Sequence, residues 1–222
     1  MLDSIRTALA VCALACLTGV TWAGHKALGS VAQANNSLID NGTAMAGANV
    51  YACDVLDTDH FGDLRVQFRN SQIVLGISSE VVLDGTPDVV RVIVISGSTS
   101  FSSPTSSTLI IDTPAGPLSE ASGQAFTGIV TITGPNEEVI SAVRGSMVLK
   151  ANGVVNTIPA GKSARVTFDH PARSGCREPG EAVGPHNAGN VKVHIVGAAI
   201  VGGAGVVAWH ELTESETKPD EF

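Results

Sequence analysis

The strongest constraint on the fold is a series of short apolar runs that recur between turn residues from 29 to 168. In one of them Leu64, Val66 and Phe68 alternate with polar residues, as in a strand with one buried face. The remaining runs are 73–75, 81–83, 89–95, 109–111, 129–132, 139–143, 147–149, 154–158 and 164–168. No helical periodicity of useful length interrupts them. Strands that recur about every 8–12 residues predict an all-β domain, sandwich-like or barrel-like, of many short strands.

Two segments of this region differ from simple alternation. Residues 89–95 are almost continuously β-branched, which predicts a strand buried on both faces. The next segment, 96–108, consists mostly of serine and threonine and predicts a flexible polar hairpin loop at the surface. Phe101 is its only large apolar residue, and a binding loop is the alternative interpretation.

Residues 1–23 have the pattern of a secretory signal peptide. Arg6 precedes an apolar stretch, and Thr21 and Ala23 supply the small residues before a cleavage point at Gly24. A lipoprotein signal that uses Cys16, and an uncleaved anchor, are the alternatives. The signal pattern predicts export, with a periplasmic location for the domain that follows.

Composition divides the rest of the chain into four parts. A β domain is expected at 24–168, and a linker rich in proline, glycine and charge at 169–190. An apolar helix is expected at 191–210, and an acidic tail at 211–222.

The apolar segment predicts a transmembrane helix that tethers the domain to the envelope. The nineteen residues from Val191 to Trp209 would span about 28 Å as a helix, close to the ~30 Å of a bilayer core. Trp209 is of a type that favours the membrane interface. Small residues four apart, the pairs Ala198/Gly202 and Ala199/Gly203, predict a helix-pairing face. A helix packed on the domain or on copies of itself is the alternative.

Cleavage of the signal would remove Cys12 and Cys16 and leave Cys53 and Cys176. A remaining pair in an oxidising compartment predicts one disulfide. It would close a loop of about 120 residues and contribute roughly 4–5 kcal/mol on the chain-entropy model. Two independent thiols are the alternative.

Composition and motifs disfavour several functions. The net charge of −8 disfavours nucleic-acid binding, because phosphate contacts need clustered lysine and arginine. The six histidines are scattered and no Cys-x-x-Cys occurs, so neither a metal nor a cofactor is expected. No Gly-x-Ser-x-Gly elbow is present, and the side chains of the adjacent Glu137 and Glu138 should diverge on a strand. We therefore expect a protein that is not an enzyme.

Acidic residues near 57–62 resemble the start of a calcium loop. An EF-hand needs an oxygen ligand at position five and a glutamate at position twelve, where this chain has Phe61 and Phe68. A polar turn between strands is favoured over a cation site. The carboxylates of the less favoured site would be Asp54, Asp57, Asp59 and Asp63.

The order of several motifs resembles the FecR-like domain, the periplasmic part of regulators of FecR type. The motifs that carry the resemblance lie at 42–50, 53–58, 62–68, 76–83, 113–116, 123–126, 145–148 and 158–164. The resemblance implies a periplasmic β module that engages another protein or an envelope component. Cys53 stands where the family has glycine, and no cytoplasmic sigma-factor-binding segment is recognised upstream, so the family's anti-sigma role is not carried over.

The sequence thus predicts an exported, non-catalytic module of FecR-like type that acts in protein interaction or signalling. Its expected partner is an envelope protein or a cell-wall component, with the membrane contacted through the C-terminal helix. The alternative is a structural surface or filament subunit that self-assembles as a homo-oligomer.

Overall fold

The computed structural model describes residues 26–104, 109–121, 123–169 and 189–198. These residues form sixteen strands, which confirms the all-β prediction. In this part of the chain there is no helix with the length and apolar character needed to span a membrane. The predicted signal peptide lies outside the described residues.

The strands are β1 (Gly29–Ile39), β2 (Gly42–Thr43), β3 (Asn49–Val50), β4 (Val55–Phe68), β5 (Gln72–Leu75), β6 (Glu80–Thr86), β7 (Val89–Ser96), β8 (Ser98–Ser103), β9 (Leu109–Thr113), β10 (Gly116–Glu120), β11 (Phe126–Gly134), β12 (Glu137–Arg144), β13 (Met147–Ala151), β14 (Val154–Ile158), β15 (Lys162–Phe168) and β16 (Val191–Ala198).

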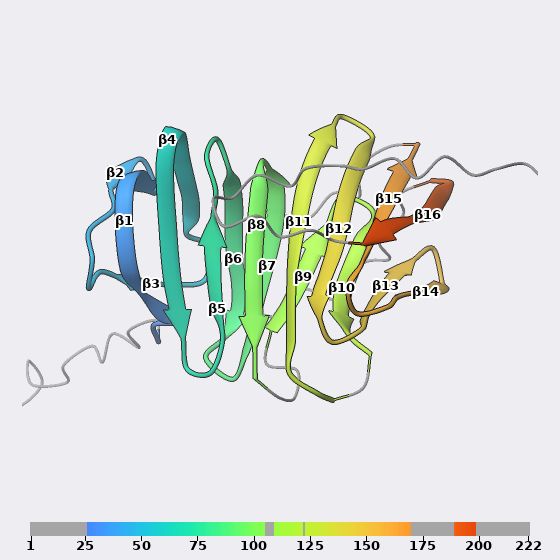
Figure 1. Ribbon diagram of the computed structural model, residues 1–222. Coiled ribbons are helices and arrows are strands. Elements are labelled where there is room, and N and C mark those ends of the chain that lie inside the picture. Colours follow the sequence, from blue (N-terminus) through green and yellow to red (C-terminus); the bar gives the residue numbers. More distant parts are fainter. Residues whose placement is uncertain (1–25, 105–108, 122, 170–188, 199–222) are drawn as a thin grey trace, which may run out of the picture.

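All strands belong to one hydrogen-bonded sheet that folds over into two layers (Figure 1). The long strand β4 joins the layers, because its first residues pair with β6 and its last residues pair with β5. One layer continues through β6, β7, β9, β10 and β13 to β14, and the other through β5, β8, β11, β12 and β15 to β16. β1 pairs with β4 and with the short strands β2 and β3. The result is a nearly closed, barrel-like sandwich with a corner at β4 and an open end between β14 and β16.

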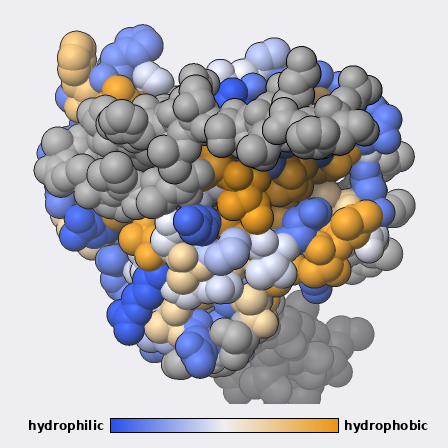
Figure 2. Space-filling view, turned by 45° about the vertical axis from the view of Figure 1, so that its right-hand side comes forward, coloured by the Kyte–Doolittle hydropathy of each residue, from blue (hydrophilic) through white to orange (hydrophobic). Residues whose placement is uncertain are grey.

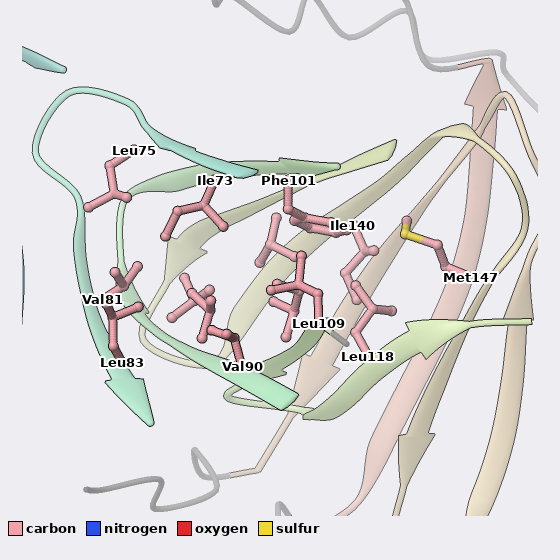
Figure 3. Close-up of a cluster of buried hydrophobic side chains, with 14 of the residues drawn as sticks. Ile73, Leu75, Val81, Leu83, Val90, Phe101, Leu109, Leu118, Ile140 and Met147 are labelled. Carbon is pink, nitrogen blue, oxygen red and sulfur yellow. The ribbon is translucent and has the colours of Figure 1, made fainter. Parts of the chain in front are cut away.

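The hydrophobic core lies between the two layers (Figure 3). Ile73 and Phe101 come from one layer, and Leu109 and Leu118 come from the other; all four are buried. The ring of Phe101 also packs on that of Phe126, with ring centroids 5.8 Å apart. Each large apolar side chain buried in this way contributes roughly 1.5–3 kcal/mol.

The alternation in the second half of β4 is confirmed. Leu64, Val66 and Phe68 are buried in the core, while Arg65 and Gln67 lie more exposed between them. The β-branched run in β7 follows the prediction only in part. Val90, Val92 and Val94 join the core and Ile93 is buried on the other face, whereas Val89 and Ile95 are exposed.

The prediction of a surface loop at 96–108 is wrong for its first half. Ser98–Ser103 forms β8, which lies within a layer between β5 and β11. Thr99, Phe101 and Ser103 point inward and are buried. The polar composition does not exclude a strand here, because the backbone N–H and C=O groups of β8 are hydrogen-bonded to a neighbouring strand on each side.

The predicted apolar helix at 191–210 is also wrong in its first eight residues. Val191–Ala198 forms β16, which pairs with β15 and so adds a strand beyond the predicted domain boundary at 168. Val191 and Val193 pack against the core, while Lys192 and His194 alternate with them. This two-residue period is typical of a strand, and it outweighs the overall apolar composition. Residues 199–210 and the acidic tail lie outside the described part.

Candidate functional site

A hollow of about 650 Å³ lies at the corner of the sandwich, where β4 passes from one layer to the other. It is lined by Asn36, Ser37, Leu38, Thr43, Asp57, Thr58, Asp59, His60, Ser78, Glu80 and Ser96. Volumes of about 300–1,000 Å³ are usual for small-ligand pockets. This hollow differs from most of them because polar side chains dominate its lining.

One row of directly paired residues runs across five strands and contributes to this lining. The pairing register places Thr43 opposite Leu38, Leu38 opposite Asp57, Asp57 opposite Glu80, and Glu80 opposite Ser96. Residues that lie directly opposite each other project from the same face of a sheet. The row therefore brings the carboxylates of Asp57 and Glu80 side by side at the hollow.

The rest of the lining comes from β1, from the bend in β4 and from the loop between β5 and β6. The hydroxyl of Ser78 lies 2.8 Å from Nδ1 of His60, and the backbone N–H of His60 donates to Oδ1 of Asp59 at 2.7 Å. Ser78 has a positive φ of 48°, and its N–H donates to the Asp59 carbonyl. Gly62 allows the bend, because a Cβ there would meet the backbone of Asn36 and Asp59.

A serine hydroxyl beside a histidine ring is the beginning of a nucleophile–base pair, which needs a third group that orients the ring. Here the Asp59 carboxylate bonds the backbone of His60. In the described part of the chain, no carboxylate is bonded to the ring itself. The arrangement therefore offers hydrogen-bond donors and acceptors to a ligand more readily than it offers nucleophilic chemistry.

The four carboxylates of the less favoured cation site are separated in the fold. Asp57 and Asp59 line the hollow. Asp54 is buried beyond it and accepts the Tyr51 N–H, and its burial raises the pKa of its carboxyl. Asp63 accepts hydrogen bonds from Gln33 and Asn35. Among the described residues, no group of three or more His, Cys, Asp and Glu is placed to hold a metal ion.

The open end of the sandwich is the second surface with functional potential. β14 pairs only with β13, and β16 pairs only with β15, among the strands of the described chain. Val154 and Val155 on β14 are 59% and 61% exposed, and Ile195 and Val196 on β16 are 53% and 41% exposed. Figure 2 turns this end forward and shows hydrophobic surface on it.

The residues of the predicted disulfide are only partly described. Cys53 lies in the turn before β4 with a positive φ of 77°, and it is disulfide-bonded. Cys176 lies outside the described residues, so its pairing with Cys53 stays a prediction.

The predicted helix-pairing face is corrected at one position. Ala198 is the last residue of β16, so it does not lie on a helix. Its predicted companions Ala199, Gly202 and Gly203 lie outside the described residues.

The sequence indicates Asp57 and Asp59 as candidate ligands, but it does not indicate that Glu80, Ser78 and Leu38 belong to the same site. These residues come from different strands, and only the register between the strands brings them together. The exposed valines of β14 could have been found, because Val154 and Val155 are adjacent and a strand with one buried face exposes at least one of them.

No protein-family model matches the sequence, and no curated protein matches it either.

Proposed function

We propose that the chain is an exported, non-catalytic β module of FecR-like type that binds an envelope protein through the open end of its sandwich. The observation that carries this proposal is the unpaired edge of β14 in the described part of the fold. An unpaired edge presents backbone N–H and C=O groups that an extended segment of another protein can pair with as an added strand.

The edge of β14 lacks the usual protection against strand addition. Its sequence, Val-Val-Asn-Thr-Ile, contains no charged residue and no proline, the two features that most often block edge pairing. Val154 and Val155 are more than half exposed and would supply apolar contact to a partner strand. By contrast β16 carries the exposed Lys192, so β14 is the preferred docking edge.

Two observations support export. The pattern of residues 1–23 is that of a signal peptide. Cys53 is disulfide-bonded, and structural disulfides persist mainly in oxidising compartments such as the periplasm.

We further propose that the chain is tethered to the membrane by a segment shorter than the predicted 191–210. Because β16 takes 191–198, the apolar residues left in the segment are 199–210, which would span about 18 Å as a helix. A bilayer core is ~30 Å thick. A helix that spans the bilayer would therefore have to include residues that form β16 in the structure. If β16 stays in the sheet, the shorter segment 199–210 would enter only one leaflet of the membrane.

Site-specific photo-crosslinking in cells that express the full chain tests the docking edge. A photoreactive phenylalanine analogue is placed at Val155, and the matched control carries it at Met45, which is 69% exposed and lies away from β14. We expect one defined envelope protein to be crosslinked from 155 and not from 45. The purified partner should bind the full chain, and V155K should weaken this binding at least tenfold because it places a charge on the edge. Equal crosslinking from both positions, or binding unaffected by V155K, would refute edge docking.

The alternative function is a self-assembling surface or filament subunit. It is favoured by the exposed aliphatic side chains on both free edges, since β14 of one copy pairing with β16 of the next would build an open filament. In the crosslinking experiment this alternative yields adducts with the mass of two or more copies of the chain. Light scattering of the purified chain would then show polymers that grow with concentration and that V155K abolishes.

A further inference from the structure

We propose that the partner closes the whole open end with one extended segment, bent at its middle, that pairs with β14 in one layer and then with β16 in the other. Closure of both edges rests on the proposed function and extends it, because docking on β14 requires only a single short strand. β14 and β16 are the last strands of their layers and lie at the same end of the molecule, on the right in Figure 1. A segment that pairs with one edge is therefore close to the other, since stacked sheets lie about 10 Å apart.

The first support is that the core is open at this end. Val154 is paired with Ala151, which is 2% exposed, and Ile195 is paired with the fully buried Ala164. Residues that lie directly opposite each other project from the same face of a sheet, so both side chains point toward the core. They are nevertheless 59% and 53% exposed. A strand added to β14 alone would leave Ile195 uncovered.

The opposite end of the molecule shows how one strand can cover two layers. β1 pairs with both halves of β4: residues 29–35 follow the half that joins β5, and residues 37–39 follow the half that joins β6. Asn36 lies between these two stretches and has a positive φ of 41°. Val31 of β1 is 2% exposed and belongs to the core. At the open end the described part of the chain provides no such strand, so we assign this role to the partner.

The direction of the two edge strands defines the path of the segment. β14 and β16 begin together, because the Asn152 side chain before β14 donates a hydrogen bond to the Gly189 carbonyl before β16. They also end together, because a short connection joins Ile158 to Lys162, and Lys162 pairs with Ala198. A bent segment is therefore antiparallel to one strand and parallel to the other, as β7 and β9 are in this sheet. Antiparallel pairing is slightly more stable, and we assign it to β14 because that edge carries no charge.

The two edges define the chemistry of the segment. β14 offers five residues, and about three more are needed to cross between the layers. A segment as long as β1, which has 11 residues, therefore reaches β16. Every second residue should be apolar, because these residues face Val154, Ile195 and the core. On its outer face β16 exposes Lys192 and His194, so we expect an acidic residue in the part of the segment beside β16.

The test maps where the partner contacts each edge of the full chain in cells. A photoreactive phenylalanine analogue is placed at Val155 on β14 and, in a second chain, at Val196 on β16; both side chains point away from the core. The matched control carries it at Val89 on β7, which is 44% exposed and lies in the middle of its layer. The crosslinked peptides are then identified by mass spectrometry.

We expect the analogues at Val155 and Val196 to crosslink one partner protein, at two sites within a single stretch of about fifteen residues or fewer. The analogue at Val89 should give no adduct with that protein. A synthetic peptide of the crosslinked stretch should bind the purified full chain, and each half of the peptide should bind at least tenfold more weakly.

Substitutions on β16 test the second half of the path. I195K should weaken binding of the whole peptide at least tenfold, whereas I95K, the same change at an exposed isoleucine of β7, should not. K192E should weaken binding at least threefold, because it replaces an attraction to the acidic residue by a repulsion. The thermal unfolding midpoints of these variants check that a loss of binding does not reflect unfolding.

Several outcomes would overturn closure of both edges. Adducts from Val155 without adducts from Val196, or binding unchanged by I195K and K192E, would leave docking on β14 intact and show that the segment does not run beside β16. Adducts with two separate partner segments, with a second copy of the chain, or within the same copy would show that one partner strand does not close the end. The absence of adducts from both positions would refute edge docking itself, and closure of both edges with it.

Discussion

Glu138 is a fully buried carboxyl in the core, and it makes the stability of the domain dependent on pH. It extends from β12 of one layer to the end of β9 in the other, where Oγ1 of Thr113 lies 2.7 Å from its Oε1. The same threonine hydroxyl lies 2.9 Å from the Gly116 carbonyl, and a single hydroxyl hydrogen serves only one of these acceptors. A protonated Glu138 resolves the conflict, because it donates to Thr113 while Thr113 donates to Gly116.

Burial raises the pKa of Glu138 from its ordinary 4.5 to about 7, and hydrogen bonds from Thr113 and the Ala115 backbone only partly oppose this rise. Its other oxygen, Oε2, has no partner among the described residues. Between pH 4.5 and 7 the folded state therefore holds its proton while the unfolded chain releases it, so the free energy of unfolding falls as the pH rises. The difference in pKa corresponds to roughly 3 kcal/mol, present in full below pH 4.5 and lost as the pH passes 7.

The substitution Glu138→Gln tests this reasoning by making the group permanently neutral. Urea unfolding followed by far-ultraviolet circular dichroism at pH 4.5, 6 and 8 should show that the wild type loses roughly 3 kcal/mol more than E138Q over this range. The buried amide adds its own cost of about 1–3 kcal/mol, but this cost does not change with pH. The quantity to measure is therefore how the difference in free energy of unfolding between the two proteins changes with pH. The constant part of that difference does not test the pKa of Glu138.

The adjacent carboxyl provides the matched control. Glu137 faces the other side of β12, where it accepts a hydrogen bond from Thr133 and lies 3.7 Å from Arg165. E137Q leaves Glu138 in place, so this variant should show the same Glu138-dependent fall in stability between pH 4.5 and 8 as the wild type. If the free energies of unfolding of the wild type and E138Q change with pH in parallel, Glu138 does not titrate between pH 4.5 and 8. That result would refute a raised pKa for this carboxyl.

The remaining predictions concern packing, covalent structure and attachment. Gly128→Ala should lower the free energy of unfolding by about 1–3 kcal/mol in urea titrations, because its Cβ would lie 2.7 Å from the Met147 sulfur; an unchanged midpoint would mean that Met147 moves aside freely. Non-reducing peptide mass spectrometry of the exported chain should recover Cys53 linked to Cys176, and a linkage to another cysteine would contradict the assignment. Deletion of 199–222 should release the chain from membranes in carbonate extraction while its thermal unfolding midpoint stays the same; a truncated chain that still sediments with membranes would show that this segment is not the tether.

The fold class could be predicted from the sequence because alternation is a local signal. Leu64, Val66 and Phe68 indicate a half-buried strand without knowledge of its neighbours. β8 and β16 depart from the predictions for opposite reasons. β8 consists mostly of serine and threonine, which is unusual for a sheet interior, and β16 begins a longer apolar run that conceals the alternation of Val191 and Val193 with polar residues.

The hollow could be predicted only in part because register is not a local property. Asp57 and Asp59 are near neighbours in sequence, but Glu80 joins them only through the pairing of β4 with β6. The buried state of Glu138 was equally hidden. Adjacent strand residues point to opposite faces, so the sequence indicated that Glu137 and Glu138 diverge but not which of them enters the core.

Three features of this domain depart from what favours a stable β protein, and only one of them is explained within the described chain. Glu138 breaks the apolar core, but Thr113 and the Ala115 backbone give its carboxyl hydrogen-bond partners. The paired carboxylates of Asp57 and Glu80 have no such compensation, and neither has the uncharged free edge of β14. Local rules are most often broken at functional sites, because a partner supplies what the chain lacks. The open end would then need a strand from another protein, and crosslinking from Val155 tests this requirement.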